Sequence, residues 1–176
     1  MTMPFLHRHR SRLAGLGLRV LIGTSLALAV QCANAYSGDA RQCRASGGTL
    51  RDGQVIAQPR FSHGRYRKGI ELSHTHLKIR GQDGRVYKVA IDNVFASGYR
   101  PGMKTVPAPL NAIAVGAKVQ ACGIPFRGGI HWVHDNCGDT PTRSDPNGWI
   151  KLVQADGRAG PNLEASRTYC YLWPRH

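Results

Sequence analysis

Two pairs of short β-prone segments, each joined by a glycine-containing turn, constrain the fold of this chain more than any other feature. In the first pair, residues 77–80 and 86–91 flank the sequence GQDG, which is typical of a hairpin turn. In the second pair, residues 118–124 and 129–134 flank PFRG, and a further short strand is predicted at 149–152. Two hairpins with extra strands over about 100 residues predict a mainly β fold, as a small closed barrel or a sandwich.

The apolar residues before the first hairpin predict a change of buried face. Ile70 and Leu72 fall on even positions, whereas Leu77 and Ile79 fall on odd ones. Because side chains alternate along a strand, both pairs cannot lie on one face of an unbroken strand. A bulge or bend is therefore expected near His74.

The start of the chain has the three zones of a signal peptide. Its first 19 residues carry four arginines and no acidic residue, and residues 20–30 are apolar or small except for Thr24 and Ser25. The sequence Ala33-Asn34-Ala35 then matches the small-residue pattern at which signal peptidase cuts. An uncleaved membrane anchor is the alternative, but a span needs about 20 apolar residues. We predict a cleavable signal peptide at 1–35 and a periplasmic or secreted protein with no transmembrane span in the mature chain.

Removal of that signal leaves one strongly basic chain of domain size. Of the 176 residues, 141 remain, with 20 Lys and Arg against 10 Asp and Glu, a net charge of +10. We expect residues 36–68 to form a basic N-terminal extension and residues 69–176 to form the β domain with its C-terminal tail. A length near 140 residues suits a single core.

The mature chain contains four cysteines, Cys43, Cys122, Cys137 and Cys170. An even number in an exported chain predicts two disulfides, because an oxidising compartment preserves such bonds. A zinc site is the alternative, but no C-x-x-C spacing is present. Three pairings are open. We expect Cys122–Cys137, which would bridge the second hairpin, and Cys43–Cys170, which would tie the two ends of the domain.

The most distinctive stretch is Gly128-Gly129-Ile130-His131-Trp132-Val133-His134, followed by Gly148-Trp149-Ile150-Lys151. It resembles a group of small exported bacterial proteins known only as a domain-of-unknown-function family, which share a Gly-Gly-aliphatic-His-Trp-x-His strand and a Gly-Trp-Ile-Lys strand. The likeness covers roughly residues 74–152 and departs at Ala117, where the family usually has Asp. The resemblance implies a five-stranded OB-like barrel with short flanking segments, and it implies no activity.

Several histidines are candidates for a metal site. His74 and His76 have the i, i+2 spacing that places two imidazoles on one face of a strand. A third ligand, His131 or His134, would complete a three-histidine zinc or copper site. His131 and His134 are three positions apart, so in a continuous strand they point to opposite faces. If Trp132 is in the core, His134 is expected to be buried with it and to bond a buried backbone group.

A catalytic role is the weaker alternative. His131 with Asp135 or Asn136 could form a metal-dependent hydrolase or nuclease site, with His134 as a further candidate. Asp92, Asp135 and Asn136 could instead orient an imidazole or help to bind a cation.

The basic residues indicate an anionic partner. Cations interleaved with aromatic side chains are typical of grooves that bind single-stranded nucleic acid, and OB barrels commonly provide such grooves. The same charge could bind a cell-envelope polymer. We predict a non-enzymatic protein that binds an anionic polymer, of undetermined oligomeric state, through Arg60, Arg65, Tyr66, Arg67, Lys68, Lys78 and Arg80.

Overall fold

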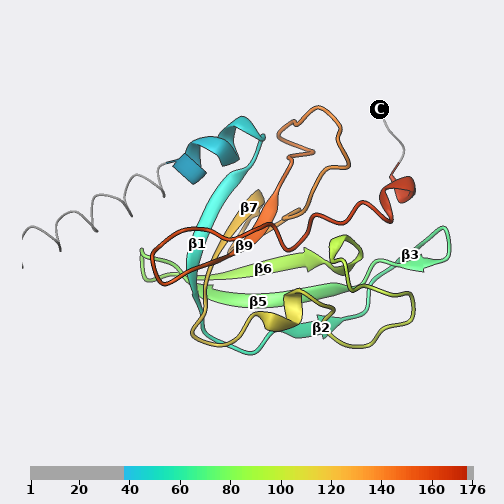
Figure 1. The fold of residues 1–176 in the computed structure, drawn as a ribbon, viewed down its shortest axis with the longest axis horizontal. Helices are drawn as coiled ribbons and strands as arrows, with labels where there is room; N and C mark the ends of the chain where they lie inside the picture. Colours follow the sequence, from blue (N-terminus) through green and yellow to red (C-terminus); the bar gives the residue numbers. More distant parts are fainter. Residues whose placement is uncertain (1–37, 174–176) are drawn as a thin grey trace, which may run out of the picture.

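The computed structural model describes residues 38–173, in which five strands close a barrel and two flanking segments cover it (Figure 1). The barrel strands are β1 (Thr49–Val55), β5 (His74–Arg80), β6 (Val86–Asp92), β7 (Lys118–Phe126) and β8 (Gly129–His131). The remaining strands are β2 (Arg60–Ser62), β3 (Tyr66–Arg67), β4 (Ile70–Glu71) and β9 (Trp149–Val153). Both predicted hairpins and the predicted strand near 149–152 are present.

The strand order is that of an OB-like barrel. Around the barrel the strands follow β1-β5-β6-β8-β7, and β7 pairs back with β1 to close it. All of these pairs are antiparallel except β6 with β8, which is parallel. The first three barrel strands are thus neighbours in chain order and the last two are exchanged, as in an OB-fold. The expected fold class, a mainly β five-stranded OB-like barrel with two disulfides, is confirmed.

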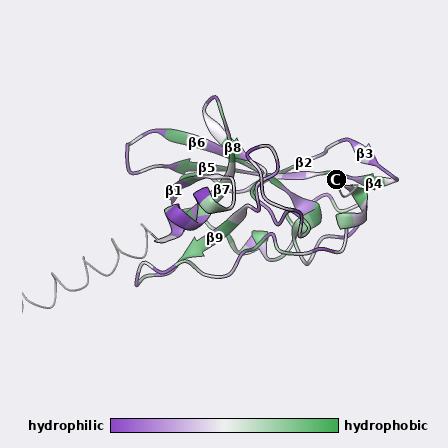
Figure 2. Ribbon diagram, turned by 90° about the horizontal axis from the view of Figure 1, so that it is seen from above, coloured by the Kyte–Doolittle hydropathy of each residue, from purple (hydrophilic) through white to green (hydrophobic). Residues whose placement is uncertain are grey.

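Alternation along β5 produces the barrel core. Thr75, Leu77 and Ile79 point inward and are buried, whereas Lys78 and Arg80 are exposed. Figure 2 shows the corresponding mixture of hydrophobic and hydrophilic residues along the barrel strands, with a hydrophilic loop joining β5 to β6. A core of inward-facing apolar residues stabilises the barrel by about 25 cal/mol for each Å² of apolar surface removed from water.

The predicted change of face before the first hairpin is also present. β4 ends at Glu71 and β5 begins at His74, so the two are separate strands. Ile70 and Leu72 pack in a cluster with Phe95, away from the barrel core.

The first barrel strand carries little sequence signal. β1 reads TLRDGQV, and most of its residues are only partly buried. It is a strand because β7 pairs with it along six positions and β5 pairs with its end. A side chain on Gly53 would meet the Arg80 carbonyl oxygen at 2.4 Å, so the close crossing of β1 and β5 requires glycine there. The barrel therefore takes its first strand from residues that the sequence assigned to an N-terminal extension.

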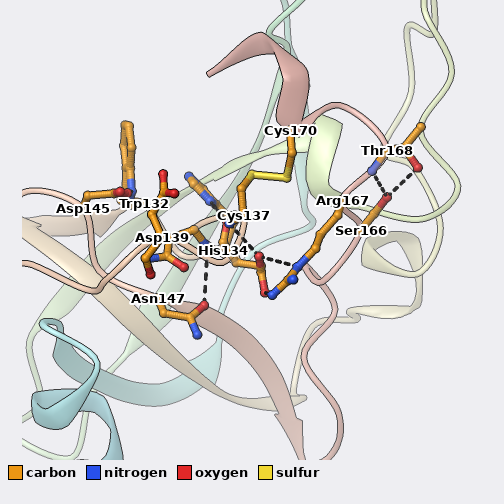
Figure 3. Close-up of a disulfide and its surroundings, with 12 residues drawn as sticks. Trp132, His134, Cys137, Asp139, Asp145, Asn147, Ser166, Arg167, Thr168 and Cys170 are labelled. Atoms are coloured by element: carbon orange, nitrogen blue, oxygen red, sulfur yellow. Dashed lines mark hydrogen bonds and ion pairs between the residues drawn. A yellow bond between two sulfur atoms is a disulfide. The ribbon is translucent and has the colours of Figure 1, made fainter. Parts of the chain in front are cut away.

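The predicted disulfide pairing is wrong. Cys43 is bonded to Cys122, and Cys137 is bonded to Cys170. Val119 and Ala121 point into the barrel, so Cys122 points outward, where it meets the helical residues 38–45 that carry Cys43. Cys137 lies in the loop after β8, away from the outer face of β7, and reaches the C-terminal segment instead (Figure 3).

The signal peptide predicted at 1–35 lies outside the described residues. Within residues 38–173, no helix has the length and apolar character needed to cross a membrane.

Candidate functional site

Two adjoining pockets lie beside the end of β6 and the start of β5. The first has a volume of about 870 Å³, and the second of about 750 Å³. Arg67, Trp132 and Trp173 line both, so together they form one open depression, which we call the aromatic cleft.

A histidine–aspartate pair lies at the base of the cleft. His74 and Asp92 are opposite each other in the β5–β6 register, and the His74 Nε2 lies 2.6 Å from the Asp92 Oδ1. The other carboxylate oxygen of Asp92 lies 3.6 Å from the His134 Nε2. His74 remains 33% exposed, whereas His134 is only 2% exposed. Asp92 therefore bonds one accessible imidazole and lies close to one buried imidazole, whose Nε2 has no hydrogen-bond partner.

The environment sets the charges of these three groups. The hydrogen bond to Asp92 raises the pKa of His74, although burial opposes the shift. Burial works to raise the pKa of Asp92, but the hydrogen bond with His74 and the charge of that imidazolium outweigh it and lower that pKa. Burial lowers the pKa of His134. His74 and Asp92 thus favour the ion pair, and His134 favours the neutral imidazole.

His134 is buried by stacking and by a backbone bond. Its ring lies parallel to that of Phe95, with the centroids 3.8 Å apart. Its Nδ1 lies 2.7 Å from the carbonyl oxygen of Asp135, so the predicted bond to a backbone group is confirmed. The contact with Asp92 is additional and could not be seen in the local sequence.

The expected alternation through His134 is wrong because β8 ends at His131. Trp132 has a φ of 59°, which breaks the strand, and the buried residues after it are Val133 and His134 together. The Trp132 side chain stays half-buried at the cleft, where its Nε1 donates a hydrogen bond to the Asp145 Oδ1 at 3.1 Å. Figure 3 shows Trp132 and Asp145 near His134.

Cations and aromatic rings line the mouth of the cleft. Arg65, Tyr66 and Arg67 come from the segment around β3, and Phe126 comes from the end of β7. The Arg67 guanidinium carbon lies 5.5 Å from the ring centre of Trp173. Tyr66 is 69% exposed, so one of its ring faces is open to a ligand.

The remaining predicted ligand residues lie outside the cleft. Arg60 on β2 and Lys78 on β5 are exposed on the outer face of the sheet, and Lys78 is directly opposite Lys88 on β6. Arg80 lies at the far end of β5, beside a separate pocket. The Lys68 ammonium donates to the Tyr171 carbonyl oxygen at 2.8 Å, so Lys68 holds the C-terminal segment.

The histidines predicted as metal ligands are only partly brought together. The His74 and His76 rings stack with centroids 6.0 Å apart, so they share a face as predicted. However, Asp92 occupies the His74 Nε2, and the Ser62 hydroxyl lies 2.8 Å from the His76 Nε2. His131 lines the cleft with His74. Among residues 38–173, no three His, Cys, Asp or Glu side chains are grouped so as to hold a metal ion.

The predicted catalytic group of His131, His134 and Asp135 is also divided. Both Asp135 carboxylate oxygens accept from the Arg167 guanidinium, at 3.0 and 2.9 Å, and one also accepts from the Cys137 backbone N–H. Asp135 therefore anchors the C-terminal segment near the disulfide, while His131 lies in the other pocket of the cleft.

Sequence reasoning missed Trp173, Phe126 and Glu164. Trp173 ends an aromatic run that begins beside Cys170, which is the one signal that the tail could contribute to a site. Glu164 is fully buried, neither of its carboxylate oxygens has a hydrogen-bond partner, and burial raises its pKa well above the ordinary value.

The fold and the site together define an OB-like barrel with a basic, aromatic cleft at one end of its β5–β6 hairpin. No protein-family model matches the chain, and a search of curated proteins finds no match either. The resemblance to small exported bacterial proteins therefore stays a prediction.

Proposed function

We propose that the protein binds a single strand of nucleic acid, with bases in the aromatic cleft and phosphates on its cations. The observation that carries this proposal is the gathering of Arg65 and Arg67 with exposed aromatic rings in one open cleft. Base–aromatic stacking contributes about 1–3 kcal/mol per base, and arginines attract the phosphates between bases.

The outer face of the sheet offers a path for the rest of the strand. Arg60, Lys78 and Lys88 are exposed there, and we call them the outer basic face. Two lysines directly opposite each other in a sheet repel and destabilise it. A polyanion lying along this face would relieve that repulsion. OB barrels use the same outer face, formed by their second and third strands, for oligonucleotides.

The aromatic walls favour nucleic acid over other anionic polymers. An envelope polymer such as lipopolysaccharide supplies phosphate but no flat base to stack on cleft rings such as Tyr66. A ligand recognised by charge alone would make no use of these rings.

The test is a salt titration of binding. Fluorescence anisotropy with a labelled dT15 oligonucleotide should give a log–log salt slope of about −0.7 for each phosphate contacted. Lys78→Ala with Lys88→Ala should flatten the slope by about 1.4, since two contacts are lost. Tyr66→Ala should weaken binding by about 1–3 kcal/mol without changing the slope, because stacking displaces no counterions.

The matched control removes two cations elsewhere. Lys118 begins β7 and Arg158 follows β9, and both are exposed at the end of the barrel away from the cleft. Lys118→Ala with Arg158→Ala should leave the slope within experimental error. Equal binding to heparin or lipopolysaccharide, together with insensitivity to Tyr66→Ala, would show a nonspecific cationic surface and contradict the proposal.

A further inference from the structure

His74 is an accessible imidazole whose second nitrogen is free for a ligand. Asp92 occupies its Nε2 at 2.6 Å, and the ring is one-third exposed at the cleft. A carboxylate that fixes one ring nitrogen orients the imidazole and stabilises its protonated form. Accordingly, Asp92 raises the pKa of His74. This geometry suits a proton donor.

A second imidazole lies in the same pocket. His131 ends β8 and lines the cleft with His74, and its ring makes an edge contact with Phe126 at 5.8 Å. Asp92 lines this pocket as well, so both imidazoles and the carboxylate face the same space. The cleft thus offers two histidines from β5 and β8, the two strands that pair with β6 on either side.

Two arginines complete the set. Arg65 and Arg67 line the same pocket, and a fixed guanidinium stabilises the charge that develops on phosphate oxygens during phosphoryl transfer. In RNA, the ribose 2′-hydroxyl can attack the neighbouring phosphate and break the phosphodiester bond. An enzyme catalyses this reaction with an acid, a base and cations placed around the phosphate.

We propose that the cleft cleaves single-stranded RNA by transphosphorylation, with His131 as general base and His74, oriented by Asp92, as general acid. This inference rests on the proposed binding of a nucleic acid strand. It adds a reaction, and with it a requirement for the ribose 2′-hydroxyl.

The step needs no co-reactant. His131 takes the proton of the 2′-hydroxyl, and the 2′-oxygen forms a bond to phosphorus. The bond from phosphorus to the 5′-oxygen breaks, and that oxygen takes a proton from His74. The products are one strand that ends in a 2′,3′-cyclic phosphate and one that begins with a 5′-hydroxyl. Solvent then returns His74 and His131 to their starting protonation states.

The experiment compares two oligonucleotides with one difference. One is a labelled rU15 strand, and the other is the same strand with 2′-deoxyribose throughout. Incubation with the full chain in EDTA should cut the ribose strand to fragments with 2′,3′-cyclic phosphate ends, read by mass spectrometry. The deoxyribose strand should be bound and stay intact.

Three single variants then assign the chemistry. His74→Asn and His131→Asn should each lower the cleavage rate by about 100-fold or more, the usual contribution of a general acid or base. Both should still bind the deoxyribose strand within about threefold of the wild type, which also shows that the cleft is folded. His76→Asn is the matched control, because His76 is adjacent on the same strand face but lies outside the cleft. It should cleave at the wild-type rate.

The outcomes separate the two proposals. Binding of both strands with intact RNA would overturn the inference and leave the proposed function standing. If the protein binds neither strand detectably, both proposals are overturned. Cleavage that survives both histidine variants, or that is lost in EDTA, would overturn the assignment of acid and base.

Discussion

Two disulfide-bonded flanks cover the barrel, an N-terminal helix and a C-terminal segment that runs across the molecule from β9, and they bury different chemistry (Figures 1 and 2). The N-terminal flank, residues 38–48, is tied to β7 by Cys43–Cys122 and packs with Leu50 and Trp149. The C-terminal flank, residues 159–173, is tied to the loop after β8 by Cys137–Cys170. It brings Trp173 to within 5.0 Å of Phe95, and it carries the buried Glu164.

The difference is one of role. At the N-terminal flank, the disulfide joins a helix to the outer face of β7 within a small apolar cluster, so it stabilises the barrel. At the C-terminal flank, the disulfide ties down a segment whose Trp173 ring lines the cleft and which also carries the buried Glu164. Both disulfides therefore stabilise the folded chain, but only the second one also holds a side chain of the cleft.

The largest expected effect is loss of the N-terminal disulfide. Cys43→Ala with Cys122→Ala opens a loop whose ends are 79 positions apart, and chain entropy alone predicts a loss of about 4.5 kcal/mol in unfolding free energy. Urea unfolding measures this loss. Affinity for dT15, measured where the variant is folded, should stay within about twofold of the wild type. A large loss of affinity would contradict the separation of the two flanks.

Loss of the C-terminal disulfide should cost less stability and more affinity. Cys137→Ala with Cys170→Ala opens a loop of 33 positions, for which the same relation predicts about 3.7 kcal/mol. Trp173 would no longer be held at the cleft, so binding of dT15 should weaken by about 1–3 kcal/mol, the value of one stacked base. Trp173→Ala with the disulfide intact is the matched variant. Unchanged affinity in both would show that the tail contributes nothing to the cleft.

The last expected effect is a pH dependence of stability that comes from the buried carboxyl of the C-terminal flank. Folding raises the pKa of Glu164 above its ordinary value of 4.5, so the folded chain binds this proton more tightly than the unfolded chain. The resulting stability is complete below about pH 4.5 and is lost as the pH rises through the folded pKa, by about 1.4 kcal/mol per pKa unit of difference. Glu164→Gln has no such proton. The unfolding free energy of this variant should therefore increase relative to that of the wild type as the pH rises.

A glutamate with the opposite shift supplies the control for this titration. The hydrogen bond with His63 lowers the pKa of Glu71, so its contribution is present above about pH 4.5 and is lost as the pH falls. Glu71→Gln should therefore lose stability relative to the wild type as the pH rises. A flat difference for Glu164→Gln between pH 4 and pH 8 would show that this carboxyl titrates normally in the folded chain.

Local pattern determined much of the barrel. β5, β6, β7 and β8 were predictable because their buried residues alternate and glycine turns separate them, and these signals act over a few residues. β1 was not predictable, because its pairing with β7 and β5 rather than its own TLRDGQV sequence makes it a strand. The end of β8 was not predictable either, because Trp132 adopts a positive φ, which residues other than glycine rarely do.

By itself, the sequence determined the fold class, the presence of two disulfides and the cluster of basic residues at 60–68. These depend on composition, on short periodicity and on the number of cysteines. Only the tertiary structure decided which cysteines pair and which groups meet in the cleft. Cys122 turns outward because Val119 and Ala121 fill the core, and this sends it to Cys43 rather than to Cys137. Trp173 reaches Arg67 because the Cys137–Cys170 disulfide and the contacts of Lys68 and Asp135 hold the C-terminal segment, which brings together groups more than 100 positions apart in the chain.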